Sequence, residues 1–303
     1  MAYDIITVGG ANADVFLKTK AETITHENHR DICYRLGEKL LIDKLTLKTG
    51  GGGSNTAVAF SRLGLKTAFL GLLGKDIYAD MILKELKKEK VDFIGKTKFG
   101  NTGYSIILPS HGERTILVFK GLNNELSWKD VPQNKIKAKW FYLSTLLGTG
   151  LETIEKLAAH AKKNKIKVAA NMSIYLAKQG FKTLSPFLKN IDILILNKEE
   201  AIALSHSINI KDAIKKISVY VKTIVITDGF NPALAFDGKK IYTKKIKRIN
   251  PVEKTGAGDA FAAGFIYGMI KNKPIPICLS YGHKEALSVM KHIGAKDDLL
   301  RNL

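Results

Sequence analysis

The stretch Asn250-Pro-Val-Glu-Lys-Thr-Gly-Ala-Gly-Asp-Ala-Phe-Ala-Ala-Gly264 leads from small residues into a helix. The first N–H groups of a helix have no partner inside it, and glycine lets an anion approach the backbone closely. Gly256, Ala257 and Gly258 can therefore direct donors at a phosphate, with Asp259 beside it in the first turn. A carboxylate there can deprotonate an attacking hydroxyl while the amides stabilise a transferred phosphoryl group. An ordinary helix start capped by aspartate fits this segment equally well.

A second glycine cluster covers residues 49–64, with Gly50, Gly51, Gly52 and Gly53 ahead of a helical pattern. Four glycines allow a polar ligand to come close to the chain, and Asn55 offers it both a donor and an acceptor. A flexible turn between a strand and a helix is the alternative. The cluster matches neither the P-loop nor the complete Gly-x-Gly-x-x-Gly fingerprint, which argues against a nicotinamide dehydrogenase.

The third polar element, Gly9-Gly10-Ala-Asn12-Ala-Asp14, follows the first strand-like run directly. Ligands of open α/β sheets bind beyond the carboxyl ends of the strands. Asn12 and Asp14 are therefore well placed to bind hydroxyl groups, although both residue types are also common in turns.

The rest of the chain alternates β-branched runs with amphipathic helical patterns. The predicted strands are Asp4–Val8, Thr67–Gly71, Trp140–Leu143, Lys167–Ala170, Asp192–Leu196 and Thr223–Thr227. The predicted helices are Asn55–Leu63, Ile77–Glu89, Leu151–Lys163, Phe181–Leu188, a helix from Glu199, Gly256–Met269 and Pro276–His292. This alternation predicts an α/β fold with a mostly parallel sheet that helices cover on both faces.

Two regions lack this rhythm. Arg35–Leu47 and Thr102–Phe119 alternate polar and apolar residues with no helix between them, and Ser110–Glu113 is the expected turn of the second. We expect them to form a small separate sheet that acts as a lid over a cleft. Arg114 in this turn could reach an anionic substrate, although an exposed hairpin arginine is the plainer interpretation. No role is assigned to the excursion over residues 20–38.

Composition excludes several classes of function. The net charge of the 303-residue chain is +20, but lysines spread along the sequence supply most of it, and the arginines and aromatics of base recognition are not concentrated anywhere. No apolar run reaches membrane-spanning length, and the N-terminus shows no signal peptide. The two cysteines, Cys33 and Cys278, have no metal-type spacing. We expect a cytoplasmic protein that binds neither nucleic acid nor membrane.

Together, the three polar elements resemble the PfkB (ribokinase-like) family of carbohydrate and nucleoside kinases. The segment 50–64 resembles the first signature of that family, and Gly256–Asp259 resembles the second. The resemblance covers the whole chain and implies one kinase domain over residues 1–303, with a three-layer α/β/α core. It also implies a small β-lid, formed from about 15–19, 35–48 and 99–120. The implied activity is ATP- and Mg²⁺-dependent phosphorylation of an alcohol.

The resemblance assigns roles to residues that match the motifs of the family. Asp259 matches the catalytic base and Gly256, Ala257 and Gly258 the anion hole. The positions that match substrate contacts are Asn12, Asp14, Gly51, Gly52 and Asn55. The positions that match nucleotide contacts are Asn197, Thr227, Gly229 and His283. Glu200 matches the residue that organises Mg²⁺, through water. A solvated first-turn glutamate and a helix-surface histidine remain the alternatives for Glu200 and His283.

Two departures from the family concern cations and substrate. Many relatives have Asp-Thr-Thr before the second signature and bind a monovalent cation there, whereas this chain has Glu253-Lys254-Thr255. We therefore hypothesise that potassium activates weakly or not at all. Relatives specific for ribose have a glutamate after the strand that ends at Leu143, where this chain has Ser144-Thr145. We favour a sugar or sugar acid over ribose or a nucleoside as substrate.

Two alternatives to a sugar kinase remain at this point. One is a nucleoside kinase of the same family, and the other is a regulator that keeps the fold and binds sugar or nucleotide without catalysis. The regulator would be marked by loss of the base or the anion hole, and both are present. We also expect a homodimer in which the lids meet.

Overall fold

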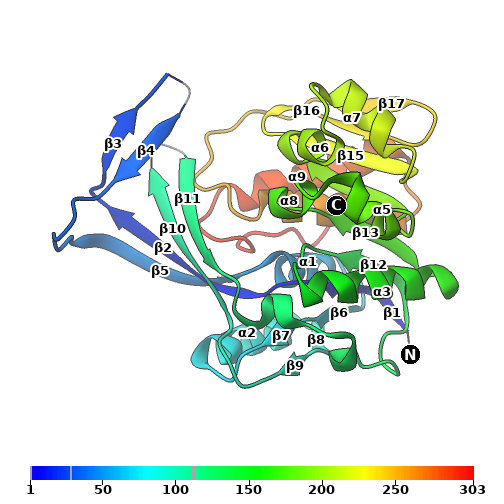
Figure 1. Cartoon of the computed structure of the whole chain (residues 1–303), viewed down its shortest axis with the longest axis horizontal. Coiled ribbons are helices and arrows are strands. Elements are labelled where there is room, and N and C mark those ends of the chain that lie inside the picture. Colours follow the sequence, from blue (N-terminus) through cyan, green and yellow to red (C-terminus); the bar gives the residue numbers. More distant parts are fainter. Residues whose placement is uncertain (1, 28, 111–112) are drawn as a thin grey trace.

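The computed structural model describes residues 2–27, 29–110 and 113–303. Within these residues the largest element is a nine-stranded sheet with the order β17-β16-β15-β14-β13-β12-β1-β6-β8 (Figure 1). Neighbours from β15 through β8 pair in parallel, whereas β16 and β17 are antiparallel. The strands are β1 (Tyr3–Val8), β6 (Thr67–Leu70), β8 (Asp92–Phe93), β12 (Ala138–Leu143), β13 (Lys167–Asn171), β14 (Ile193–Asn197), β15 (Thr223–Asp228), β16 (Asn231–Phe236) and β17 (Ile241–Lys244).

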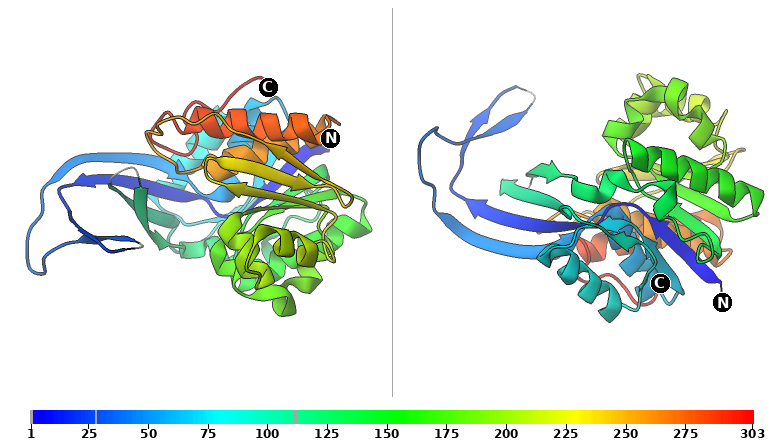
Figure 2. Two further views of the ribbon diagram at one scale, coloured as in Figure 1. Left: turned by 90° about the horizontal axis from the view of Figure 1, so that it is seen from above. Right: turned by 60° about the horizontal axis from the view of Figure 1, so that its bottom comes forward.

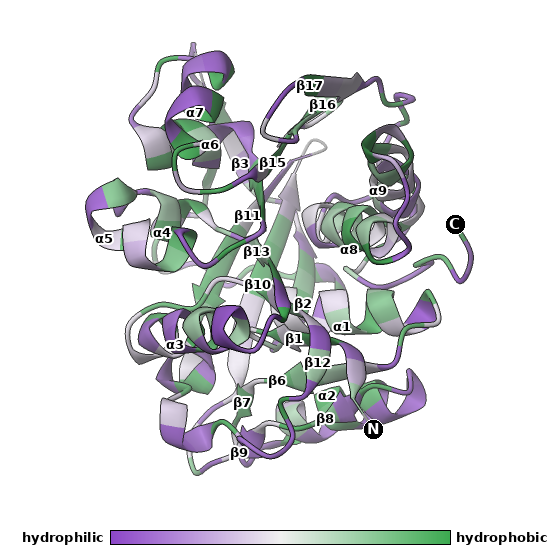
Figure 3. Ribbon diagram, turned by 90° about the vertical axis from the view of Figure 1, so that its right-hand side faces the viewer, coloured by the Kyte–Doolittle hydropathy of each residue, from purple (hydrophilic) through white to green (hydrophobic). Residues whose placement is uncertain are grey.

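Two layers of helices enclose this sheet, as Figure 3 shows. On one side lie α1 (Gly52–Arg62), α2 (Ile77–Lys88), α8 (Ala257–Ile270) and α9 (Ile275–Val289). On the other side lie α3 (Thr149–Lys163), α4 (Ile174–Ala177), α5 (Gly180–Leu188), α6 (Lys198–Ser205) and α7 (Ile210–Ile217). The predicted three-layer architecture is confirmed. Each predicted strand and helix of these layers is present with ends shifted by a few residues, whereas β8, β16, β17, α4 and α7 were not predicted.

The buried core explains why the central strands are so apolar. In β14 the residues Ile193 to Leu196 are all buried, because helices cover both faces of the sheet. Helix α8 is buried over most of its circumference because it packs between α1 and α9. Its small residues allow that close packing, since a Cβ at Gly264 would lie 2.5 Å from the Tyr281 carbonyl oxygen.

A second, four-stranded sheet projects from one end of the core (Figure 2). Its order is β11-β10-β2-β5, from β2 (Asn12–Thr19), β5 (Ile42–Gly50), β10 (Gly103–Ser110) and β11 (Glu113–Phe119). This is the small separate sheet expected from the sequence, and we call it the lid sheet after the role that the sequence predicts for it. The predicted turn at Ser110–Glu113 includes residues 111 and 112, which lie outside the described residues.

The predicted strand over Arg35–Leu47 is only partly right. The sheet strand β5 starts at Ile42, and residues 34–41 are not in a strand. Gly37 has a φ of 82°, which turns the chain away from an extended path. The excursion before it contains a separate hairpin, β3 (Glu22–Thr25) and β4 (Arg30–Cys33), and residue 28 at its turn lies outside the described residues.

The remaining short elements complete the scaffold. A two-stranded parallel pair joins β7 (Leu72–Leu73) to β9 (Lys96–Thr97), and two 3₁₀ turns, η1 (Gly121–Glu125) and η2 (Trp128–Asp130), follow the lid sheet. Cys33 and Cys278 are both unpaired. In the part of the chain that the structure describes, no helix has both the length and the apolar character needed to cross a bilayer.

Candidate active site

A polar cavity of about 200 Å³ lies where the carboxyl ends of the central strands meet the base of the lid sheet. Such a position is the usual ligand site of an open α/β sheet. Chain segments far apart in sequence contribute to its wall: the β1–β2 turn, the start of α1, η1, the ends of β12 and β13, and the start of α8. The lining residues are Gly10, Asn12, Gly51, Gly52, Lys120, Asn123, Asn124, Ser144, Thr145, Leu146, Asn171, Ser173 and Asp259.

A carboxylate oriented by an amide occupies one side of this cavity. Asn55 Nδ2 donates to Asp259 Oδ2 at 2.8 Å, across 204 residues of sequence. Burial raises the pKa of Asp259, whereas this hydrogen bond and the charge of Lys296 oppose the rise. The amide oxygen, Asn55 Oδ1, is buried with no hydrogen-bond partner among the described residues, and Asn55 does not itself line the cavity. Asn55 therefore orients the Asp259 carboxylate, which does line the cavity.

The start of α8 presents free backbone donors next to this carboxylate. Gly256 has a φ of 80°, and a Cβ there would lie 2.5 Å from the Ala295 Cβ, so only glycine fits. The N–H of Ala257 donates to the Lys254 carbonyl at 3.2 Å, which differs from the expectation that it faces an anion. Among the described residues, the N–H groups of Gly256 and Gly258 donate to no backbone carbonyl. A Cβ at Gly258 would meet no atom within 4 Å, so the space in front of it is open.

The glycine cluster at residues 50–53 serves packing as much as ligand access. The Gly53 and Ser54 N–H groups both donate to the Gly10 carbonyl, at 3.1 and 3.3 Å, which joins the start of α1 to the β1–β2 turn. Gly51 has a φ of 93° and contacts this turn so closely that a Cβ would lie 2.5 Å from Gly10 O. Gly52 borders the cavity, since its Cβ would lie 3.3 Å from Asp259 Oδ1. Gly51 and Gly52 thus keep the cavity open.

The structure separates the two polar residues at the start of β2. Asn12 lines the cavity, and its Oδ1 accepts a 2.7 Å hydrogen bond from Asn123 Nδ2. Asp14 is buried and does not line the cavity. It lies behind Gly50, since a Cβ added to that glycine would be 1.7 Å from Asp14 Oδ2. Burial, with smaller contributions from Asp259 and Glu253, raises the pKa of Asp14 to about 6, although Ser105 and Lys296 oppose the rise.

Several lining residues were not anticipated from the sequence. The set comprises Lys120, Asn123, Asn124, Asn171 and Ser173. Asn171 is the last residue of β13, so the strand-end rule that selected Asn12 could have found it. The η1 residues carry no such signal, because they reach the cavity only when the chain returns from the lid sheet.

Lys120 and Ser173 bring two further polar groups to the cavity. Burial lowers the pKa of Lys120. The Ser173 hydroxyl has no hydrogen-bond partner among the described residues, while its N–H donates to the Thr145 hydroxyl at 2.6 Å. Both side chains line the cavity, and among the described residues neither would have to give up a hydrogen bond or an ion pair to bind a ligand.

Three of the four residues matched to nucleotide contacts lie at or just after the ends of β14 and β15. Asn197 and Thr227 are register partners on these adjacent strands, and Gly229 follows in a turn with a φ of 54°. Asn197 and Glu200 form a reciprocal capping box at the start of α6, with bonds of 2.8 Å in both directions. Burial, assisted by Glu199 and Asp259, raises the pKa of Glu200 to about 7, despite the hydrogen bond from the Asn197 N–H.

His283 is buried in α9, so the alternative of a helix-surface histidine is wrong. Its ring centroid lies 5.3 Å from that of Phe261 on α8, and its Nδ1 has no hydrogen-bond partner among the described residues. Burial, with a smaller contribution from Lys244, lowers the pKa of His283 to about 4. The imidazole is therefore neutral at physiological pH.

Two ion pairs join the tip of the lid sheet to the loop before α8. Arg114 Nε lies 3.5 Å from Glu253 Oε1, and Lys254 Nζ lies 2.6 Å from Glu113 Oε1. Glu253 also accepts hydrogen bonds from the Thr255 N–H and hydroxyl, at 2.6 and 2.8 Å. Arg114 thus contacts its own protein, in contrast to both sequence interpretations. The unusual Glu253-Lys254 pair is one half of this contact, which we call the lid latch.

Lys296, a buried lysine near the C-terminus, forms an ion pair with a residue of α2. Lys296 is 3% exposed, and its Nζ lies 2.5 Å from Glu85 Oε2 on α2, which also accepts from the Thr49 hydroxyl. The neighbouring Asp297 pairs with Lys48 of β5 at 2.7 Å. The C-terminal segment therefore connects α2, the base of β5 and the turn at Gly256.

Comparison with known proteins places this arrangement among small-molecule kinases. The chain is 27% identical over 252 residues to an uncharacterized sugar kinase of Archaeoglobus fulgidus, covering 81% of this chain and all of that protein. It is 29% identical over 277 residues to the ribokinase of Haemophilus influenzae, covering 87% and 88% of the two chains. The adenosine kinase of Sinorhizobium meliloti shares the fold, with a TM-score of 0.86 at 21% identity over 99% and 98% of the two chains.

The family of this chain is identified by a direct match to a family model. The model of the pfkB family carbohydrate kinases covers residues 18–301, so the chain belongs to that family. It is a phosphotransferase of the kind that acts on a hydroxyl. The fold is that of the ribokinase-like kinases, with the mostly parallel sheet and the small separate sheet described above.

Proposed function

We propose that the protein transfers the γ-phosphate of ATP to a hydroxyl of a sugar or sugar acid. The observation that carries this proposal is the Asn55–Asp259 pair at the side of a small polar cavity. The sugar or nucleoside class of substrate follows from the family, and the choice within that class rests on the cavity.

Asp259 is the proposed catalytic base. Its carboxylate accepts the proton of the substrate hydroxyl while that oxygen attacks the γ-phosphorus, and the bond to the β-phosphate oxygen of ATP breaks. The raised pKa brings this carboxyl closer to the pH at which a base is effective. Asn55 holds Oδ2, which leaves Oδ1 directed to the Gly52 side of the cavity.

The proposed anion hole consists of the Gly256 and Gly258 N–H groups. Both stand at the positive end of α8, next to Asp259, so they can stabilise charge that develops on the transferred phosphoryl group. The Ala257 N–H is excluded from this role because it donates to Lys254 O. Asn197, Thr227, Gly229 and His283 are the proposed ATP contacts.

A magnesium ion fits the carboxyl end of β14. Glu200 is a half-buried carboxyl whose pKa is raised to about 7, first by desolvation and then by other acids, and a nearby cation would relieve that repulsion. Oxygen donors are the ligands that Mg²⁺ prefers, usually with several waters retained. We propose that Glu200 holds Mg²⁺ through water, and when bound the ion would neutralise phosphate charge.

The cavity supports a sugar or sugar acid over a nucleoside. None of its described lining residues is aromatic, and Leu146 is its one large apolar side chain, whereas a nucleobase needs a flat apolar surface. The amides and hydroxyls of Asn12, Asn171 and Ser173 suit a polyol. The ammonium of Lys120 has no ion-pair partner among the described residues and is the proposed anchor of a substrate carboxylate.

The four-stranded sheet is the proposed lid of this domain. The lid latch holds its tip against the loop that leads to Asp259, which would exclude water from the phosphoryl group. Exposed apolar residues on the same sheet support the expected homodimer, namely Leu45, Leu47, Ile116, Leu117, Val118 and Phe119. Sedimentation of the wild-type chain would test this second point.

The test of the proposed function is an ATP-consumption screen with Mg²⁺. The acceptors are hexoses, pentoses, sugar acids, sugar phosphates and nucleosides, and Lys120→Met is assayed beside the wild type. We expect turnover with a sugar or sugar acid, and for an acid we expect Lys120→Met to raise KM while kcat changes little. Turnover confined to nucleosides would overturn the substrate class, and turnover of no acceptor would favour a non-catalytic regulator.

A further inference from the structure

The hairpin of β3 and β4, which no part of the proposed mechanism uses, gathers two histidines and an aspartate on one face. Ile24 pairs with Asp31 and Thr25 with Arg30, and the next position is closed by a 2.9 Å bond from the His26 N–H to the His29 carbonyl. His26 therefore stands opposite His29. Since side chains alternate along a strand, His29 and Asp31 point to the same side.

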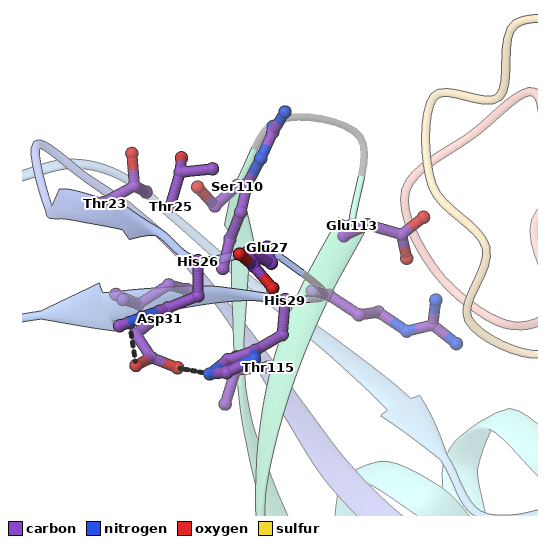
Figure 4. A pocket seen from close by; sticks show the side chains of 12 residues that line it. Thr23, Thr25, His26, Glu27, His29, Asp31, Ser110, Glu113 and Thr115 are labelled. Carbon is purple, nitrogen blue, oxygen red and sulfur yellow. Dashed lines mark hydrogen bonds and ion pairs between the residues drawn. The ribbon is translucent and has the colours of Figure 1, made fainter.

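The ligand atoms of these three side chains converge on one point (Figure 4). His26 Nε2 lies 3.1 Å from Asp31 Oδ2, and His29 Nε2 lies 3.8 Å from Asp31 Oδ1. All three ligand atoms lie within 4.8 Å of one another. Two ligands on a tetrahedral zinc ion, with bonds of about 2.0–2.1 Å, are separated by about 3.4 Å. The two histidine–aspartate separations, each to a different oxygen of the Asp31 carboxylate, lie on either side of that value.

We propose that His26, His29 and Asp31 form a binding site for a divalent transition-metal ion, for which Zn²⁺ is the natural probe. Two imidazoles and one carboxylate suit Zn²⁺, Co²⁺ or Ni²⁺, whereas Mg²⁺ prefers oxygen ligands. Among the described residues this is the one group of three such side chains whose ligand atoms converge. The site is separate from Glu200 and does not depend on the proposed function.

An open coordination position faces a pocket between the hairpin and the tip of the lid sheet. This pocket has a volume of about 440 Å³, and Glu27, Glu113 and Arg114 line it together with the three ligands. A water molecule, or a carboxylate that lines this pocket, completes the coordination of the metal ion. Glu113 and Arg114 also form the lid latch, so the metal lies beside the contact that positions the lid.

A metal ion would cross-link the two strands of the hairpin next to its turn, beyond the Thr25–Arg30 pair. An isolated two-stranded hairpin has little stability of its own in water, and these two strands pair only with each other. The imidazole rings already lie parallel, with centroids 4.5 Å apart. The ion would replace the existing His26–Asp31 contact, so the chain needs little rearrangement to bind it.

The test uses the full chain without a histidine tag, freed of metal by a chelator that is then removed. Calorimetric titration with Zn²⁺ should show one saturable site per chain, which millimolar Mg²⁺ does not displace. His29→Gln combined with Asp31→Asn should weaken binding at least tenfold. Both residues are exposed, so thermal melting of this variant should match the wild type. Absence of a saturable site, or wild-type affinity in the double variant, would overturn the proposal.

His292→Gln is the matched control. His292 Nε2 lies 2.8 Å from Asp298 Oδ2, which makes a similarly exposed histidine–aspartate pair that has no third ligand among residues 2–27, 29–110 and 113–303. This variant should keep full Zn²⁺ affinity, and its loss would move the site away from the hairpin. Hydrogen exchange gives an independent readout, since Zn²⁺ should slow exchange in residues 22–33 of the wild type. Unchanged exchange there with Zn²⁺ bound would also overturn the assignment.

Discussion

The two sheets of this molecule are held in place by different forces. In β14 of the central sheet, four consecutive residues are buried, whereas six of the seven residues of β11 in the lid sheet are exposed. Burial of apolar surface fixes the central strands, because helices enclose both faces. The lid sheet has one open face, and polar contacts at its edges determine where its tip lies. We infer that the central sheet holds the proposed catalytic groups in place, whereas the lid sheet controls access to the cavity.

The energies of the two kinds of contact differ accordingly. A fully buried large apolar side chain contributes about 1.5–3 kcal/mol, and the central sheet contains many of them. The lid latch and the Lys48–Asp297 pair are partly exposed ion pairs, of a kind that contributes about 0–1 kcal/mol each. A lid held this weakly can open for substrate without disturbing the core. The following predictions test this division.

The largest effect should come from Asp259, the proposed catalytic base, in the rigid region. Asp259→Asn should lower kcat by about 10²–10⁴, because an amide cannot accept the hydroxyl proton. ATP affinity should change little, since the base acts on the acceptor. Steady-state kinetics and nucleotide binding measure both quantities.

The control for this variant is Asp80→Asn. Asp80 also lies in the first turn of a helix, but on the exposed side of α2 and outside the cavity. It should leave kcat within twofold. A fully active Asp259→Asn enzyme would show that another group serves as base.

The second prediction concerns stability against pH in the same rigid region. The pKa of Glu200 is raised to about 7 in the folded protein, so folding favours its protonated form. Stability from this group is present below the unfolded pKa of about 4.5 and is lost as the pH rises through 7. Without nucleotide or metal, Glu200→Gln should therefore gain stability relative to the wild type between pH 5 and 8.

Urea denaturation of both proteins at pH 5 and at pH 8 measures this gain in the free energy of unfolding. A difference of about 2 kcal/mol is expected, from about 1.4 kcal/mol for each pKa unit reduced for partial solvent access. Glutamine keeps the capping box, so the cap itself is unchanged. Glu199→Gln is the control, because Glu199 is exposed at the neighbouring position. A constant difference across this pH range would contradict the raised pKa.

The third prediction addresses the lid. Lys254→Glu places two acids opposite each other in the lid latch, and KM for the acceptor should rise about two- to fivefold with kcat nearly unchanged. The double variant Lys254→Glu with Glu113→Lys restores opposite charges and should restore KM. The rise should shrink at 1 M salt, where exposed charges are screened within about 3 Å. A rise that the double variant leaves unrescued would show that Lys254 acts in another way.

The smallest effect is expected from the monovalent cation. Exchange of sodium for potassium should change the rate by less than about twofold, because Thr255 and Arg114 already occupy both oxygens of Glu253. Rates measured at equal ionic strength decide this point. A severalfold rise in potassium would show that a cation binds this loop despite these contacts.

Much of the fold could be predicted because its signals are local. The β-branched runs and amphipathic helices required no knowledge of distant residues, and the architecture they implied is confirmed. The exception was Arg35–Leu47, where alternation continued through a turn at Gly37. The alternation of polar and apolar residues indicates which face of a chain is apolar, but it does not indicate the residue at which strand pairing begins.

The candidate site was only partly predictable for a related reason. Asp259, Gly256 and Gly258 belong to one short segment, so their proximity follows from the chain itself. Asn123 bonds to Asn12 across 111 residues, and the lid latch joins Glu113 to Lys254 across 141 residues. No short-range pattern indicates such contacts.

The sequence by itself determined the layered α/β architecture, the family and the segment that carries Asp259, because periodicity and glycine placement act over a few residues. Only the tertiary structure decided that Asp14 lies behind Gly50, that Lys120 and Ser173 line the cavity, and that Glu253 and Lys254 latch the lid. These features depend on how distant segments meet when apolar surfaces are buried. That packing fixes positions in space which the order of residues leaves open.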